Sequence, residues 1–191
     1  MAQKYIEFEA FVVGAEPKVW RRFLLRESAT FEDLHHAVQD AGSWEDYHFY
    51  QFLEPKRRGA RIARHPQDDA DLGDDAPAAD RLKLGAFFQR KGKRCWYNYD
   101  FGDDWIVEVR YLGTAEMDEA IRRRLTGGER AWPPEDCGGI WGYCRCAAAA
   151  GAGGEEADQC DPEELDEIRE WMGDWHPDRF DLAACAKRFN H

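Results

Sequence analysis

The chain has 191 residues, of which 43% are hydrophobic and 14% aromatic, and its formal net charge is -12 at pH 7. This apolar content can form a hydrophobic core, since one buried aromatic side chain removes roughly 150–250 Å² from water, and it excludes a chain that is disordered throughout. The negative charge argues against duplex nucleic acid as a partner, because phosphate contacts need clustered Lys and Arg.

The sequence also lacks the signals of membrane insertion or export. No run of about 18 apolar residues could cross a bilayer, and the start MAQKYIEFEAF alternates polar and apolar residues where a signal peptide is continuously apolar. We therefore expect a cytoplasmic protein without membrane contacts. Its six cysteines favour reduced thiols over disulfides, and because their spacing matches no common zinc pattern, zinc is a less favoured ligand.

The N-terminal part predicts two strands and a helix. Residues 5–13 alternate polar and apolar positions, as in a half-buried strand, and residues 19–25 can pair with them across a Gly- and Pro-containing turn. Thr30 and Asp33 have the spacing of a capping box, and the apolar residues that follow recur at helical intervals. The predicted helix ends at Gly42.

The middle of the chain predicts further strands around a loop. Residues 48–53 alternate and are rich in aromatics, which is typical of a strand. Residues 66–80 contain six Asp and little that is large and apolar, so we expect a mobile acidic loop. A short helix is expected over 82–88. Residues 95–100 and 105–111 then form two strand patterns joined by a hairpin loop.

The C-terminal part predicts helices separated by a connector. Apolar residues at every fourth position over 117–125 indicate a helix. Residues 147–160 are rich in Ala, Gly and acidic side chains, which is typical of a flexible charged connector. Residues 161–173 carry the start and stop signals of a helix, and residues 182–189 have an apolar stripe at helical spacing.

Together these elements predict a single α+β domain over residues 1–191. Because short turns join neighbouring strand patterns, the expected sheet is mostly antiparallel, with helices packed on one side and further helices at the C-terminus.

Three passages resemble the plasmid pRiA4b ORF-3-like family. They are TFEDLHHAVQDAGSWEDYHFYQF over residues 30–52, YDFGDDW over residues 99–105 and GERAWPPEDCGGIWGY over residues 128–143. Their order, together with VWRR at residues 19–22, extends the resemblance over nearly the whole chain. It implies a compact α+β domain found in bacteria, archaea and mobile elements, with no assigned activity.

Some members of that family are described as insertion-element passengers that resemble a resolvase. A serine resolvase would need a nucleophilic serine supported by several Arg and a helix-turn-helix tail. This chain has only Ser28 and Ser43, and its C-terminal region is acidic. The sequence therefore does not favour a resolvase.

The chain also departs from the pattern of that family. Many relatives have a His shortly after the hairpin, where this chain has Ile106 and Val107. Relatives often carry Cys at positions that here lie near Leu125 and at Trp132, which leaves Cys137 alone. Both departures weaken the case for a metal site at those positions.

Acidic residues gather in the hairpin loop and in the Pro- and Gly-bounded loop of the third passage. If the two loops meet, their carboxylates could hold Mg²⁺ or Mn²⁺ and activate water, with His48 as a candidate base. Alternatively, such residues hydrogen-bond nearby backbone groups, and His48 is a hydrogen-bonded core residue. The possible metal ligands are Asp100, Asp103, Asp104, Glu135 and Asp136.

Two functions remain open. The first is a non-enzymatic binding or accessory module, associated with mobile elements, that holds an unknown protein or small ligand. The alternative is a divalent-metal-dependent phosphoester hydrolase. In either case we expect the two loops to lie side by side and to form the functional surface. The expected surface residues are Tyr99, Asp100, Phe101, Asp103, Asp104, Trp105, Arg130, Glu135, Asp136, Gly138, Gly139, Trp141 and Tyr143.

Other residues have more ordinary interpretations. Five tryptophans invite a stacking platform for single strands, but core packing is the expected role for most of them. His35 and His36 are expected on a helix, partly exposed. Three basic clusters are expected to be solvated surface groups. The tryptophans are Trp44, Trp96, Trp105, Trp132 and Trp141, and the basic clusters begin at Lys56, Arg90 and Arg122.

Overall fold

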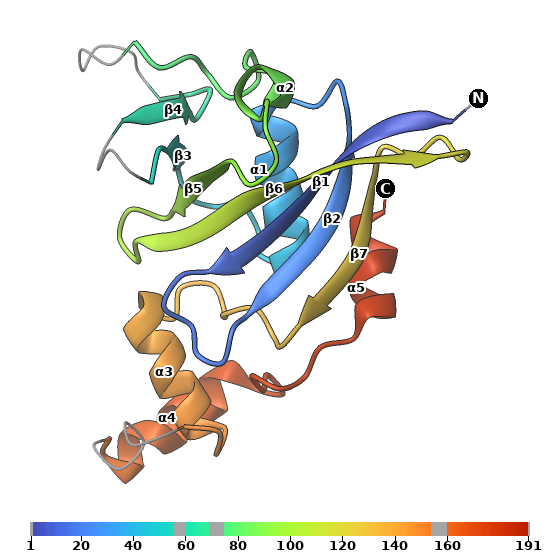
Figure 1. The fold of residues 1–191 in the computed structure, drawn as a ribbon. Coiled ribbons are helices and arrows are strands. Elements are labelled where there is room, and N and C mark those ends of the chain that lie inside the picture. The colour runs from blue at the N-terminus through green and yellow to red at the C-terminus, as the bar shows by residue number, and fades with distance from the viewer. Residues whose placement is uncertain (1, 56–59, 69–74, 154–159, 191) are drawn as a thin grey trace.

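The computed structural model describes residues 2–55, 60–68, 75–153 and 160–190. Within these ranges seven strands form one sheet in the order β4-β3-β5-β6-β1-β2-β7 (Figure 1). All named strand pairs are antiparallel. The strands are β1 (Gln3–Val12), β2 (Trp20–Arg26), β3 (Tyr50–Leu53), β4 (Arg61–Arg64), β5 (Arg94–Tyr99), β6 (Trp105–Met117) and β7 (Arg123–Glu129).

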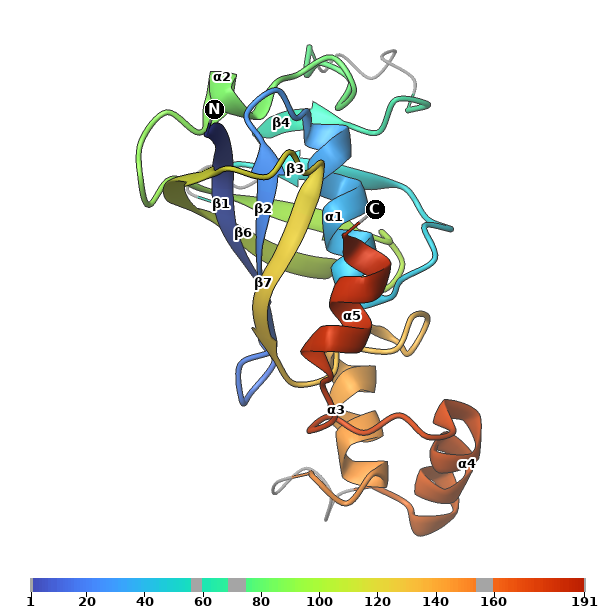
Figure 2. The ribbon, with the colours of Figure 1, turned by 90° about the vertical axis from the view of Figure 1, so that its right-hand side faces the viewer.

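Helices cover one face of this sheet. Helices α1 and α5 lie side by side on that face, and α3 and α4 lie together beyond one end of the strands (Figure 2). The predicted α+β fold with an antiparallel sheet is therefore confirmed. None of the described helices is long and apolar enough to cross a membrane. The helices are α1 (Phe31–Gly42), α2 (Leu84–Phe87), α3 (Gly139–Ala149), α4 (Pro162–Met172) and α5 (Leu182–Phe189).

The core lies between the sheet and helix α1. Alternate residues of β1 and β2, such as Phe8 and Phe23, are fully buried, as their two-residue periodicity predicts. Helix α1 begins with the predicted capping box, in which Thr30 Oγ1 accepts from the Asp33 amide and the Asp33 carboxylate accepts from the Thr30 amide. Three of the five tryptophans, Trp44, Trp105 and Trp132, pack in this core.

The helix predicted over residues 117–125 is wrong. Strand β6 continues to Met117, and β7 begins at Arg123 and pairs with β2. The connection between them is fixed by the Tyr5 hydroxyl, which donates to the Glu119 carbonyl at 3.1 Å and accepts from the Ile121 amide at 2.9 Å. Three apolar residues at helical spacing were a weaker signal than the backbone pairing that β1 and β2 offer to these segments.

The expected connector begins later than predicted, and the expected acidic loop is partly buried at its end. Ala147, Ala148 and Ala149 of the expected connector form the last turn of α3, and residues 154–159 lie outside the described residues. At the end of the expected acidic loop, Ala78 and Ala79 are buried, while residues 69–74 are not described. Small alanines fit closely packed positions, which composition alone does not distinguish from a solvated linker.

Arg21 occupies the buried junction of β2, α1 and β7. Only 3% of the residue is exposed. Its guanidinium donates to the carbonyls of Ala41, Trp20 and Glu129 at 2.8–3.1 Å and stacks on Phe180 at 3.9 Å from the ring centroid. Burial lowers the pKa of Arg21 to about 10. The charge is thus retained at neutral pH and is stabilised by backbone dipoles and aromatic faces.

Both edges of the sheet are in contact with other parts of the chain. At β4, the Arg64 amide donates to the Pro77 carbonyl at 3.0 Å and its carbonyl accepts from Ala79 at 2.8 Å. At β7, the Leu125 amide donates to the Asn190 side chain at 2.9 Å. These contacts fix the segments that precede α2 and follow α5.

His35 is buried, which corrects the expectation of partial exposure, whereas His36 is exposed. Because the Asp46 carboxylate at His35 Nε2 can only accept, Nδ1 of the neutral ring accepts from the Tyr97 hydroxyl at 2.7 Å, and this hydroxyl accepts from Gln39 at 2.8 Å. His35 Nε2 then donates to Asp46 at 3.0 Å. This network holds the neutral imidazole, and burial lowers the pKa of His35.

Replacing Arg21 with Lys should lower the free energy of unfolding by about 2–4 kcal/mol, because an ammonium cannot reach three carbonyls in fixed directions. Urea denaturation measures this loss. The control is Arg22→Lys, since Arg22 is half exposed and its ion pair with Glu9 is 3.3 Å long; it should cost less than about 1 kcal/mol. Equal losses in both variants would contradict the role assigned to Arg21.

The buried imidazole should make stability depend on pH. The unfolded chain takes up a proton at His35 near pH 6.5 while the folded chain resists it, so stability falls as pH drops below about 6.5. In thermal melts between pH 7.5 and 5.5, His35→Gln should show a smaller decrease than the wild type. His65, whose pKa burial also lowers, leaves some dependence. His36→Gln should behave as the wild type does; if it alone flattens the profile, His35 is not the group responsible.

Candidate functional site

Trp44 joins the segment after β7 to the end of β5. Its indole is 5% exposed, and Nε1 donates to the Pro133 carbonyl at 3.0 Å. The same ring stacks on Tyr99 with centroids 5.0 Å apart. The Pro-Pro segment is thus held next to the β5–β6 hairpin, because one large side chain contacts both.

Glu135 strengthens this junction. Its carboxylate accepts from the Tyr99 hydroxyl and, at 2.6 Å, from the Glu45 amide. Burial raises the pKa of Tyr99, and the acceptor Glu135 raises it further. The phenol therefore stays protonated and serves as a hydrogen-bond donor between the two segments.

Two glycines allow the start of α3 to approach the hairpin closely. The Gly138 amide donates to Asp103 Oδ2 at 3.0 Å. At Gly139, where φ is +67°, a Cβ would lie 2.3 Å from the Asp103 carbonyl oxygen. A side chain at this position would separate α3 from the hairpin. The predicted proximity of residues 99–105 and 128–143 is confirmed by these contacts.

The junction gathers one imidazole and two carboxylates. His48 Nε2 lies 2.9 Å from Asp136 Oδ1 and 3.7 Å from Asp100 Oδ2. All three ligand atoms are within 4.8 Å of one another, a spacing that a metal ion could bridge. The side chains are 33% exposed for His48, 13% for Asp100 and 60% for Asp136, so the group is open to solvent. We call it the His48 group.

Backbone conformation supports this arrangement. Asp100 and Asp136 both have positive φ, 52° and 57°. Asp tolerates this region better than most residues, because its short side chain can bond the local backbone. Asp100 does so through Oδ1, which accepts from the Gly102 amide at 2.9 Å, leaving Oδ2 directed to His48.

The other three predicted ligands accept hydrogen bonds from the protein instead. Asp103 accepts from Gly138, Asp104 accepts from Asn98 at 2.8 Å, and Glu135 accepts from Tyr99 and Glu45. The sequence could not separate these carboxylates, since all five occur in turn-rich segments.

The remaining expected surface residues divide by exposure. Trp105 and Tyr143 are buried in the core, and Arg130 pairs with Asp178. Phe101 and Trp141 are 51% and 78% exposed. The aromatic surface expected here is therefore smaller than the sequence suggested.

Two exposed aromatic residues near the site were not predicted from the sequence. Tyr47 and Phe49 flank His48 and are 70% and 51% exposed. The sequence suggested a strand from residue 48, but β3 begins at Tyr50, so these rings precede the sheet. The Phe49 carbonyl accepts from the Asp100 amide at 3.1 Å, which fixes this segment against the hairpin.

A second group of possible ligands consists of His35, His36 and Asp46. Both ring nitrogens of His35 already have protein partners, so it is a poorer metal ligand than His48. Neither group, among the residues that the structure describes, includes a cysteine.

Comparisons with known proteins give the family but no activity. The chain is similar to the uncharacterized protein y4hQ of Sinorhizobium fredii (strain NBRC 101917 / NGR234), at 29% identity over 144 residues, which are 75% of this chain and 71% of that protein. It also resembles the crystal structure of MM3350, a protein of unknown function from Methanosarcina mazei Go1, with a TM-score of 0.77 and 33% identity over 96% of this chain and 97% of that one. The family model for plasmid pRiA4b ORF-3-like proteins matches residues 4–184, and the chain belongs to this family.

Proposed function

We propose that the protein is a non-enzymatic binding module that holds a basic segment of a protein partner on the surface around His48. One observation carries this proposal: the segments that meet at the His48 group carry exposed aromatic rings beside the Asp100 and Asp136 carboxylates. Tyr47, Phe49, Phe101 and Trp141 are each more than half exposed. Large apolar side chains that remain exposed together mark interaction sites in folded proteins.

Charge selects the kind of partner. The Asp100 and Asp136 carboxylates lie within this aromatic surface, and the whole chain carries a charge of -12. An arginine side chain can pair with a carboxylate and stack on an aromatic ring at the same time. The family description refers to a plasmid, which is compatible with an accessory role for such a module in mobile elements.

A short Arg-Gly repeat peptide tests this proposal, with binding followed by isothermal titration calorimetry. Trp141→Ala should weaken binding about fivefold or more, since a stacked arginine contributes about 1 kcal/mol or more. The control is Leu182→Ala at the start of α5, where an apolar side chain is 40% exposed on a helix that packs against α1 and β7. Neither change alters net charge. If both variants bind the peptide as the wild type does, attraction is only a general charge effect and the proposal fails.

A divalent-metal-dependent phosphoester hydrolase is the second candidate, favoured by the His48 group. Three protein ligands in a solvent-open site would leave positions for water, as catalytic metal sites require. A base is harder to assign, because the group has a single imidazole and Nε2 would be occupied by the metal. A nitrogen ligand favours Mn²⁺ over Mg²⁺.

This second candidate predicts that Mn²⁺ raises the melting temperature of the wild type. Asp136→Asn should remove the shift, while Asp118→Asn, at an exposed site elsewhere, should retain it. Hydrolysis of bis(p-nitrophenyl) phosphate by the Mn²⁺-loaded wild type, lost in Asp136→Asn, would rank the hydrolase first. Metal binding without hydrolysis would exclude the hydrolase and indicate a binding surface that the metal stabilises.

A further inference from the structure

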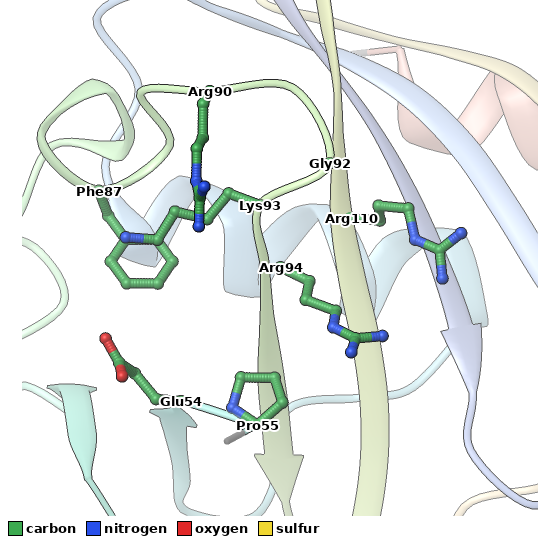
Figure 3. Close-up of a pocket in the computed structure, with 8 residues that line it drawn as sticks. All are labelled: Glu54, Pro55, Phe87, Arg90, Gly92, Lys93, Arg94 and Arg110. Atoms are coloured by element: carbon green, nitrogen blue, oxygen red, sulfur yellow. The ribbon is translucent and has the colours of Figure 1, made fainter. Parts of the chain in front are cut away.

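A cationic pocket lies at the opposite end of β5 from the His48 group. It has a volume of about 500 Å³. Its walls come from the segment after β3, the end of α2 and the turn before β5 (Figure 3). The last wall is formed by Arg94 and Arg110, which are paired residues of β5 and β6. The lining residues with charge or an aromatic ring are Glu54, Phe87, Arg90, Lys93, Arg94 and Arg110.

Two of these cations are held in place by a buried carboxylate. Glu108 is 7% exposed and lies between Arg94, at 3.3 Å, and Arg110, at 2.9 Å. Arg94 and Arg110 are opposite each other in the β5–β6 register. One carboxylate therefore orients two guanidinium groups and leaves other N–H groups of each available.

The other two cations have no such partner. Among the described residues, neither Arg90 nor Lys93 is within ion-pairing distance of a carboxylate. Lys93 Nζ lies 3.5 Å from the centroid of the Phe87 ring. In Figure 3 the Arg90 guanidinium points into the space bordered by Phe87, Lys93 and Glu54. Two unneutralised charges thus face one concave site.

Within the part of the chain that the structure describes, Arg90 and Lys93 lack the ion pairs that the third basic cluster forms. With a net charge of -12, the protein has ample carboxylates to pair with these side chains, as it does in the third basic cluster, where Arg122, Arg123 and Arg124 each pair with an acid. The excess positive charge faces a concave, solvent-open site, where it can attract an anion.

We propose that this pocket binds a phosphate dianion, either inorganic phosphate or the phosphate of a monoester. A tetrahedral dianion can accept from Arg90 and Lys93, while Arg94 and Arg110 add positive potential further along the pocket. The pocket is separate from the surface around His48, so the two proposals stand independently.

Calorimetric titration at constant ionic strength tests the site, with inorganic phosphate and adenosine monophosphate as separate probes. The wild type should bind phosphate, and Arg90→Gln/Lys93→Gln should bind it at least about tenfold more weakly, because two charge-assisted hydrogen bonds are lost. Tighter binding of the monophosphate identifies a monoester as the ligand; equal binding identifies the phosphate group alone.

The control is Lys91→Gln, which removes a charge from the same turn but does not line the pocket. It should keep the wild-type affinity within about twofold. Melting temperatures without ligand show that both variants fold. If Lys91→Gln loses as much affinity as the double variant, or if the double variant loses none, the attraction is a general ionic effect and the pocket is not a phosphate site.

Discussion

The buried guanidinium of Arg21 is the constraint on which the arrangement of β2, α1 and β7 depends. It satisfies carbonyls from all three elements, including the C-terminal end of α1 at Ala41. A charge at that end also complements the helix dipole. Gly128 of β7 must be small for the same reason, since a Cβ there would lie 2.8 Å from the Arg21 side chain and from Phe180. Because α1 leads directly to Trp44, the position of the site follows from this junction.

The fold was largely predictable from local patterns. Two-residue alternation and the Thr30 capping box predicted β1, β2 and α1, because each element must bury one face of its side chains. The same logic failed at residues 117–125, where strand pairing with β1 and β2 outweighed three apolar residues at helical spacing. Long-range pairing of this kind leaves little trace in a local window.

The sequence predicted that two segments meet at the site, but it did not predict which of their residues form the site. Turn-rich, acidic motifs indicated where functional loops would lie. Which carboxylates remain available depends on donors from distant residues, such as Gly138 for Asp103 and Glu45 for Glu135. The contribution of His48 to this group likewise depends on the loop that continues to Phe49 before β3 begins at Tyr50. Sequence spacing contains none of these distances.

The contacts at the two outer strands have a consequence for self-association. An open strand edge offers unpaired N–H and C=O groups to a second copy, which is a common route to aggregation. Here Pro77 and Ala79 occupy such groups on β4, and Asn190 occupies one on β7. Strand β4 is also only four residues long, with Arg61 and Arg64 at its ends. The sheet is therefore protected against growth by strand addition at these points.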